Sequence, residues 1–243
     1  MIPITDVHCH VLPGIDDGPA TMKETLAVLR KAQKQGIQKM IVTPHFHPSR
    51  YAVTASRVME TLEMVRQEVA RKGLEIQLYP GQECYYYSGL VDELENGNVL
   101  TMAGTRYVLV EFEGDALYST LQQAVRELRQ SDYKPIIAHY ERYTCLRGKK
   151  NRLQELHDMG AKLQMNFDCL LNNGSFFHPN PWRKQLKEGY VDFLGSDTHG
   201  MEFRPLHVGQ AVVWLKKNTE PELRTRILVK NAGLLVGKDV QRL

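Results

Sequence analysis

The chain has 243 residues, and its 42% of hydrophobic residues is typical of a folded domain with a sizeable core and excludes a disordered chain. The formal net charge is only +3. The two short basic runs, 147–150 and 216–217, are expected to be solvated surface, so we expect no nucleic-acid binding. No apolar stretch approaches the roughly 20 residues that cross a bilayer, so we expect no membrane insertion.

Seven short apolar runs alternate with helical patterns along the chain. Strands are expected at 2–7, 39–43, 75–80, 107–111, 134–139, 162–166 and 193–196. Helices are expected from the capping box Thr21-x-x-Glu24 to Gly36, from about Val58 to Gly73, over about 117–130 and near 151–159. No linker-like segment divides these elements, which predicts one domain over residues 1–243.

The cysteines are scattered without CxxC spacing, at Cys9, Cys84, Cys145 and Cys169. In a chain of this size they indicate reduced thiols, and we expect a cytoplasmic location. The sixth residue after each cysteine is not an arginine, so the signature of a cysteine-based phosphatase is absent.

Residues that bind metals follow most of the predicted strands. They lie at or just beyond the strand ends: His8, His10, Asp17, His45, Glu83, Glu111, His139, Asp197 and His199. Side chains two residues apart on a strand point the same way, so His8 and His10 can bind one ion together. Any one of these residues alone is more often structural, and Asp197 could cap a helix. Their joint pattern favours a metal site.

Nine ligands exceed the three or four that one zinc ion takes, which predicts two or three divalent ions. Mixed imidazole and carboxylate ligands suit Mn²⁺, Fe or Zn²⁺. Such clusters lower the pKa of bound water to about 7 and hold the oxygens of an in-line displacement. The sequence therefore predicts hydrolytic chemistry.

Strand–helix alternation implies parallel strands with right-handed crossovers, which a closed barrel or an open doubly wound sheet would satisfy. The ligand pattern favours the barrel, because the C-terminal ends of barrel strands converge on one mouth. We therefore predict an α/β fold, a distorted seven-stranded β/α barrel.

Two arginines follow the predicted ligands closely. Arg142 comes three residues after His139, and Arg204 five residues after His199. Their guanidinium groups match phosphate oxygens, although surface or ion-paired roles stay open. His47 lies in a loop after the second strand and is a further candidate for substrate contact. The other histidines lack strand-end context and are expected outside the site: His157, His178 and His207.

These segments resemble the PHP (polymerase and histidinol phosphatase) superfamily, and more closely the CpsB/CapC family of bacterial tyrosine-protein phosphatases. The resemblance rests on motifs along nearly the whole chain: Asp6-Val7-His8-Cys9-His10, Leu12-Pro13-Gly14-Ile15-Asp16-Asp17-Gly18, Thr43-Pro44-His45, Gly81-Gln82-Glu83, Glu111-Phe112, Ile137-Ala138-His139-Tyr140-Glu141-Arg142 and Ser196-Asp197-Thr198-His199. Residues 167–183 match no motif.

The resemblance implies a distorted seven-stranded barrel and a manganese-dependent phosphatase. Its substrate would be phosphotyrosine of a bacterial tyrosine kinase that controls capsule or exopolysaccharide export. By motif matching, the nine candidate ligands would hold the metals, Arg142 and Arg204 would bind phosphate, and Asp197 and His199 would join them in catalysis.

Three alternatives remain open from the sequence. One is another PHP phosphoesterase, such as histidinol-phosphate phosphatase or an exonuclease. Another is a metal-dependent amidohydrolase, although the strand ends offer Glu83 and Glu111 where that class normally places a bridging lysine. The last is a non-catalytic regulator that binds a kinase. The sequence does not determine the kinase, each ion's identity or the oligomeric state.

Overall fold

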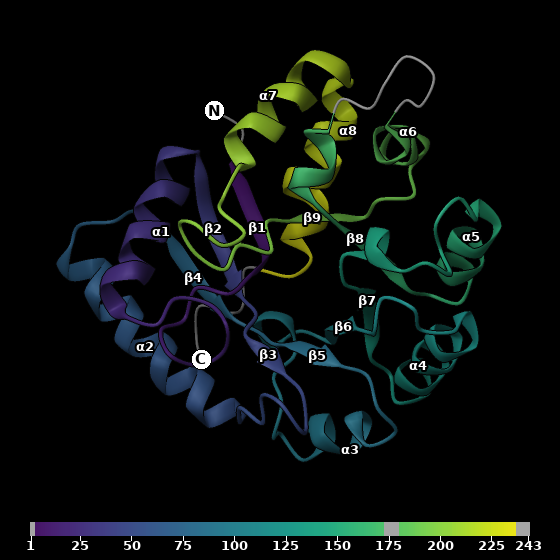
Figure 1. Cartoon of the computed structure of the whole chain (residues 1–243), viewed down its shortest axis with the longest axis horizontal. Helices are drawn as coiled ribbons and strands as arrows, with labels where there is room; N and C mark the ends of the chain where they lie inside the picture. The colour runs from purple at the N-terminus through teal and green to yellow at the C-terminus, as the bar shows by residue number, and fades with distance from the viewer. Residues whose placement is uncertain (1–2, 173–179, 237–243) are drawn as a thin grey trace.

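A ring of helices surrounds a curled arrangement of parallel strands in the computed structural model, which describes residues 3–172 and 180–236 (Figure 1). The strands are β1 (Ile4–Cys9), β2 (Ile37–Val42), β3 (His45–Phe46), β4 (Gln77–Pro80), β5 (Glu83–Tyr85), β6 (Tyr107–Glu111), β7 (Lys134–Ile137), β8 (Lys162–Asn166) and β9 (Phe193–Gly195). The helices are α1 (Met22–Lys34), α2 (Ala55–Arg71), α3 (Leu90–Glu95), α4 (Tyr118–Gln130), α5 (Lys150–Asp158), α6 (Pro181–Glu188), α7 (Val208–Asn218) and α8 (Pro221–Thr225). A π-helix, Arg226–Asn231, follows α8.

The predicted α/β class and parallel pairing are confirmed, but the seven-strand count is not. The described residues form nine strands in two sheets, with the orders β1-β2-β4 and β3-β5-β6-β7-β8-β9. Two predicted strands are each followed by a break and a short second strand, β3 or β5. At the first break, Pro44 has no N–H with which to continue the ladder. Its carbonyl instead accepts from the amide of Glu83 at 3.2 Å.

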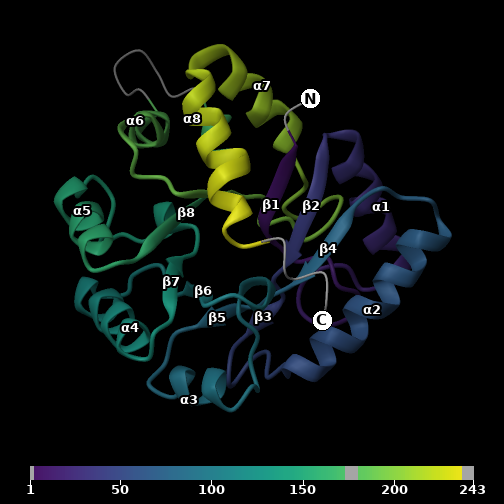
Figure 2. The same ribbon diagram turned by 180° about the vertical axis from the view of Figure 1, so that it is seen from behind.

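The first and last strands of the chain lie next to each other, which curls the arrangement (Figures 1 and 2). The amide of Asp197, just after β9, donates to the carbonyl of His8 at 2.8 Å, and the amide of His10 donates to Thr198 at 2.9 Å. The buried carboxylate of Asp6 on β1 accepts from the amide of Ser196 at 2.8 Å. The C-terminal ends of the strands consequently converge on one mouth.

Capping side chains and a glycine mark the two ends of α1. Thr21 caps α1 by accepting from the amide of Glu24. Glu24 accepts in return from the amide of Ala20, one residue before the cap, so the reciprocal bond of the predicted capping box is displaced by one residue. Gly36 follows α1 with a positive φ of 88°, which suits glycine at a helix end. Helices α3, α6, α7 and α8 were not predicted from the sequence. Among the helices of the described residues, none is long and apolar enough to cross a membrane.

A buried acid joins β8 to the segment that enters β9. The carboxylate of Asp192 accepts from the side chains of His157 at 2.7 Å and Lys162 at 3.0 Å, and from the amide of Leu163 at 2.9 Å. Burial alone would raise the pKa of Asp192, but the contacts with His157, Leu163 and Lys162 together outweigh it and lower the pKa below the usual value. The ionised carboxylate therefore stabilises the junction of the two strands.

We expect Asp192→Asn to lower the free energy of unfolding by about 3 kcal/mol at neutral pH, because a partly buried ion pair loses its anion. The folded pKa of Asp192 lies below its unfolded value of about 3.9, so the contribution is present above that pH and is lost as the pH falls through the folded pKa. Denaturant unfolding at several pH values should show the difference from wild type shrinking in acid. Asp92→Asn, at an exposed position, is the control, and an equal loss in both variants would contradict the assignment.

Candidate metal centre

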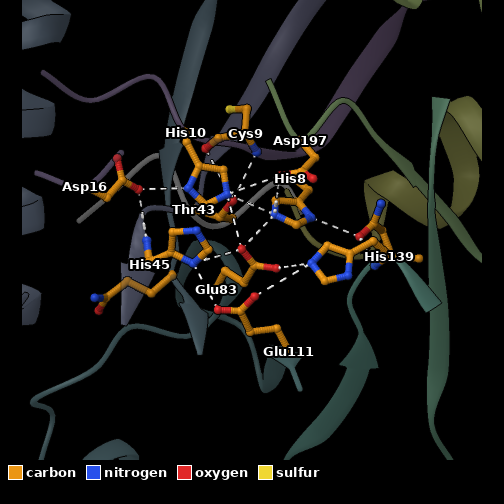
Figure 3. Close-up of polar contacts among 12 residues, drawn as sticks. His8, Cys9, His10, Asp16, Thr43, His45, Glu83, Glu111, His139 and Asp197 are labelled. Carbon is orange, nitrogen blue, oxygen red and sulfur yellow. Dashed lines mark hydrogen bonds and ion pairs between the residues drawn. The ribbon is translucent and has the colours of Figure 1, made fainter. Parts of the chain in front are cut away.

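The two histidines of β1 lie at the centre of the mouth (Figure 3). Both side chains are fully buried, and their Nε2 atoms lie 3.1 Å apart. Each Nε2 lies 3.2 Å from Oε2 of Glu83, which comes from the start of β5. Because strand ends from both sheets converge here, residues 8, 10 and 83 share one buried space.

The predicted ligands gather into three overlapping groups. Within each group the ligand atoms lie within 4.8 Å of one another: His10, Asp17, His45 and His199; His8, His10, Glu83 and Asp197; and His45, Glu83 and Glu111. His139 lies beside the third group, with its Nε2 2.8 Å from Oε1 of Glu83 and 3.8 Å from Oε2 of Glu111. The structure thus brings all nine residues together.

Two buried carboxylates show that the site fits cations. Neither oxygen of Glu83 has a hydrogen-bond partner, and the same holds for Oδ1 of Asp197. Burying an unpaired carboxylate costs several kcal/mol. The imidazole nitrogens that lie 2.8–3.2 Å from Glu83 compensate part of this cost, and a bound cation would compensate the rest. The mixed nitrogen and oxygen donors match divalent ions such as Mn²⁺, Fe or Zn²⁺.

Two acids of the cluster, Glu83 and Asp17, are ionised at neutral pH. Burial alone would raise the pKa of Glu83, but the charges of His8 and His139 hold it well below its usual value. Burial opposes ionisation of Asp17 too, but its contact with His199 lowers the pKa to about 2. These carboxylates are therefore available as ligands without losing a proton.

The imidazoles differ in pKa, and therefore in how readily each loses a proton to bind a metal ion. Burial and the nearby charge of His10 both lower the pKa of His199, which favours the neutral form that metals bind. Burial would lower the pKa of His10 as well, but Asp16 and Glu83 raise it well above the usual value. Metal binding at His10 would consequently release a proton, so we expect affinity to fall in acid.

Asp16 supports the cluster and was missed as a functional residue from the sequence. Its Oδ2 lies 2.8 Å from Nδ1 of His10 and accepts from the amide of His45 at 3.1 Å, as Figure 3 shows. Its Oδ1 accepts from the amide of Gly18, where a Cβ atom would lie 2.6 Å from the carbonyl oxygen of His10. The tight turn therefore needs glycine, and Asp16 directs Nε2 of His10 toward the other ligands.

Backbone strain is concentrated at the mouth. Among the described residues, five that are not glycine have a positive φ, and three of them belong to the predicted site: His139 at 27°, Asp197 at 51° and Arg204 at 43°. Such conformations cost of order 1–3 kcal/mol each and persist where surrounding contacts impose them. Here the chain turns sharply after β7 and β9, which leaves these side chains at the mouth.

Both predicted arginines border the cluster. Arg142 Nη2 donates to Oδ2 of Asp197. Arg204 Nη1 lies 3.2 Å from Nε2 of His199 and 3.7 Å from Oδ1 of Asp197. Arg142, Arg204 and Asp197 line one cavity of about 370 Å³. This volume falls within the range of small-molecule sites.

His47 lies on the rim rather than in the cluster. It accepts a hydrogen bond from the amide of Ser49 at 3.2 Å, and its ring packs on Tyr85 at 4.3 Å. Of the histidines expected outside the site, His157 contacts Asp192 and His207 contacts Asp168. His178 lies outside the described residues.

Comparison with known proteins identifies similar chains along almost the whole length. The family model described as capsular polysaccharide synthesis, CpsB/CapC, matches residues 4–237. The tyrosine-protein phosphatase YwqE of Bacillus subtilis is 30% identical over 239 residues, which cover 95% of this chain and 91% of that protein. The tyrosine-protein phosphatase CpsB of Streptococcus agalactiae is 25% identical over 232 residues, covering 93% and 96% of the two chains.

Solved structures extend the comparison. A chain from the crystal structures of YwqE from Bacillus subtilis and CpsB from Streptococcus pneumoniae, described as unique metal-dependent tyrosine phosphatases, superimposes with a TM-score of 0.87. It is 29% identical, and the match covers 96% of this chain and 94% of that one. An organophosphorus hydrolase from Deinococcus radiodurans, 15% identical with a TM-score of 0.60 over 97% and 93% of the chains, shares the fold.

We expect Asp16→Ala to weaken Mn²⁺ binding by roughly 10–100-fold, because residues that orient metal-binding histidines typically contribute that much to affinity. Calorimetric titration of the metal-stripped protein measures the change. Asp115→Ala, at an exposed position, is the matched control. Unchanged affinity in Asp16→Ala would show that His10 needs no such support.

Proposed function

The chain belongs to the CpsB/CapC family, and from this premise we propose that it is a metal-dependent protein-tyrosine phosphatase. Its physiological substrate would be phosphotyrosine of a bacterial tyrosine kinase that regulates capsule or exopolysaccharide production. The observation that carries the proposal is the convergence of nine imidazole and carboxylate ligands with two arginines at one mouth. The cytoplasmic location, the single domain, the kinase partner and the absence of a nucleic-acid partner stay predictions.

The nine converging residues would hold two or three divalent ions, with Mn²⁺ as the expected ion and Fe or Zn²⁺ as alternatives. When bound, such ions polarise phosphoryl oxygens and lower the pKa of water to about 7. Glu83 occupies the central position, because its Oε2 lies 3.2 Å from a ring nitrogen of each of His8, His10 and His45. Neither of its oxygens accepts a hydrogen bond, so both would be available to hold a cation.

The arginines would bind the phosphate group from the cavity side. Their side chains remain 38% and 39% exposed, so a ligand in the cavity can reach the guanidinium groups of Arg142 and Arg204. Charge-assisted hydrogen bonds from these groups would stabilise the negative charge of the transferring phosphoryl group. Tyrosine leaves as a phenolate of pKa about 10, so the reaction needs little help from a protonated side chain.

Aromatic rings at the mouth favour an aryl phosphate. Tyr51 stacks on His45 with 5.4 Å between ring centroids, and Phe203 meets His199 edge-on at 5.8 Å. Phe203 is 59% exposed, which leaves ring surface for a substrate. Aromatic pairs of this kind add about 0.5–1.5 kcal/mol beyond buried area. This rim is therefore compatible with the phenyl ring of phosphotyrosine, and a comparison of substrates distinguishes it from the other phosphoesters. The role of His47 in substrate binding stays a prediction.

We expect the Mn²⁺-loaded protein to hydrolyse a phosphotyrosyl peptide and para-nitrophenyl phosphate, and to lose this activity after chelation. Phosphate release measures the rate, and re-addition of Mn²⁺ should restore it. Histidinol phosphate and single-stranded DNA test the other PHP activities, while a lactone tests the amidohydrolase alternative. A preference for any of these three over the peptide, or activity resistant to chelation, would contradict the proposal. Absence of all activity with intact kinase binding would favour the regulator.

We expect Asp197→Ala and His139→Ala each to reduce turnover to background while the circular dichroism spectrum stays native. Each variant removes a proposed metal ligand at the mouth. His207→Ala, which changes a histidine outside the cluster, should keep wild-type kcat. Full activity in either ligand variant would refute the metal assignment.

We expect Arg204→Ala to lower kcat/KM for phosphotyrosyl peptide roughly 10²-fold, because one preorganised donor to the transition state is lost. Arg57→Ala, an exposed arginine on α2 that pairs with Glu60, is the control. Steady-state kinetics at saturating Mn²⁺ separate the effects on KM and kcat. Unchanged values of kcat and KM in Arg204→Ala would show that Arg204 does not take part in the site.

A further inference from the structure

Strand β8 ends at the mouth without any of the nine predicted ligands. It carries instead two amides, Gln164 and Asn166, which are 0% and 7% exposed. Residues two apart on a strand point to the same face, so both amides face the cluster. A buried amide needs partners for its donors and its acceptor, and the identity of these partners indicates its role.

Gln164 connects His8 on β1 with His139, which lies just after β7. Its Oε1 accepts from the backbone amide of His139 at 2.8 Å and lies 2.9 Å from Nδ1 of His8. A backbone N–H can only donate, so the Gln164 atom that faces it is the oxygen. The same oxygen requires a proton on Nδ1 of His8. In the neutral imidazole that binds metals, this leaves Nε2, which faces Glu83 at 3.2 Å, as the nitrogen with the free lone pair.

The hydrogen bonds continue from Gln164 to the acid after β9. Nε2 of Gln164 donates to Oδ1 of Asn166 at 2.9 Å, and Nδ2 of Asn166 donates to Oδ2 of Asp197 at 3.1 Å. Arg142 binds the same oxygen of Asp197. Oδ1 of Asp197 therefore stays without a hydrogen bond and lies 3.6 Å from Nε2 of His8. These contacts fix the orientation of each amide. The hydrogen-bonded relay from His8 through Gln164 and Asn166 to Asp197 therefore determines which oxygen of Asp197 faces the cluster.

Close packing holds this relay in place. A Cβ atom at Gly195 on β9 would lie 2.5 Å from Cβ of His8 and 3.0 Å from Nε2 of Gln164. Any side chain at this position would push β1 and β8 apart. Glycine at 195 therefore allows the three strands to approach closely enough for Gln164 to reach His8.

We infer that Gln164 and Asn166 are positioning residues that hold His8, His139 and Asp197 in a metal-binding arrangement before any ion arrives. The inference rests on the metal centre of the proposed function. Uncharged amides suit this task, because a carboxylate at either position would add charge to a cluster that already contains buried acids. An apolar residue would leave Nδ1 of His8 without a partner.

Two matched substitutions test the role of Gln164. Gln164→Met removes the amide while keeping the volume, and Gln185→Met does the same at a buried glutamine that binds the hydroxyl of Tyr140 outside the cluster. Calorimetric titration of the metal-stripped full chain with Mn²⁺ should give a Kd roughly 10–100-fold weaker for Gln164→Met and a wild-type Kd for Gln185→Met. Thermal unfolding should show that both variants lose stability.

Two further variants separate positioning from general damage. Gln164→Glu keeps the acceptor for His8 and His139, so it should bind Mn²⁺ more tightly than Gln164→Met. Asn166→Leu removes the donor to Asp197 and should weaken Mn²⁺ binding, which decides the question if Gln164→Met fails to fold. Wild type that binds no Mn²⁺ would refute the metal centre itself. Wild-type affinity in the Gln164→Met and Asn166→Leu variants, or equal weakening in Gln185→Met, would overturn the positioning role alone.

Discussion

The structure depends on the electrostatic balance of one buried cluster. Glu83 and Asp197 are almost completely removed from solvent and keep oxygens without hydrogen bonds. Such groups persist only where opposite charge compensates the lost hydration. Imidazoles from β1, β3 and the turn after β7 supply part of that charge, and the donor set matches divalent cations for the rest. The curled parallel strands make this possible, because neither sheet alone presents all the ligands.

Residues around the cluster orient the imidazole rings of the predicted ligands. Asp16 approaches His10 from the loop after β1, whereas Gln164 approaches His8 from β8. Both contact Nδ1 and leave Nε2 toward Glu83. Two chemically different groups on opposite sides therefore orient two neighbouring imidazoles in the same way, as outer residues do at metal sites generally.

Much of the site could be predicted from the sequence, because strand periodicity relates spacing directly to direction. His8 and His10 illustrate this, as do the ligands that end later strands. The breaks that create β3 and β5 could not be predicted, since they depend on tertiary pairing after Pro44. Asp16 lay in a recognised turn, but the separate roles of the two adjacent acids, Asp17 among the ligands and Asp16 against Nδ1 of His10, depend on the turn geometry. The amides of β8 gave no signal, because glutamine and asparagine are common surface residues.

The pairing of β1 with the segment after β9 has a consequence for assembly. Asp197 and His199 join ligands that lie almost two hundred positions earlier in the chain, so the centre is formed by contacts of very long sequence separation. Such contacts form late in folding, after local helices and neighbouring strand pairs. During synthesis, the early imidazoles leave the ribosome long before their last partners do. A complete cage for cations can exist only once residue 199 has emerged.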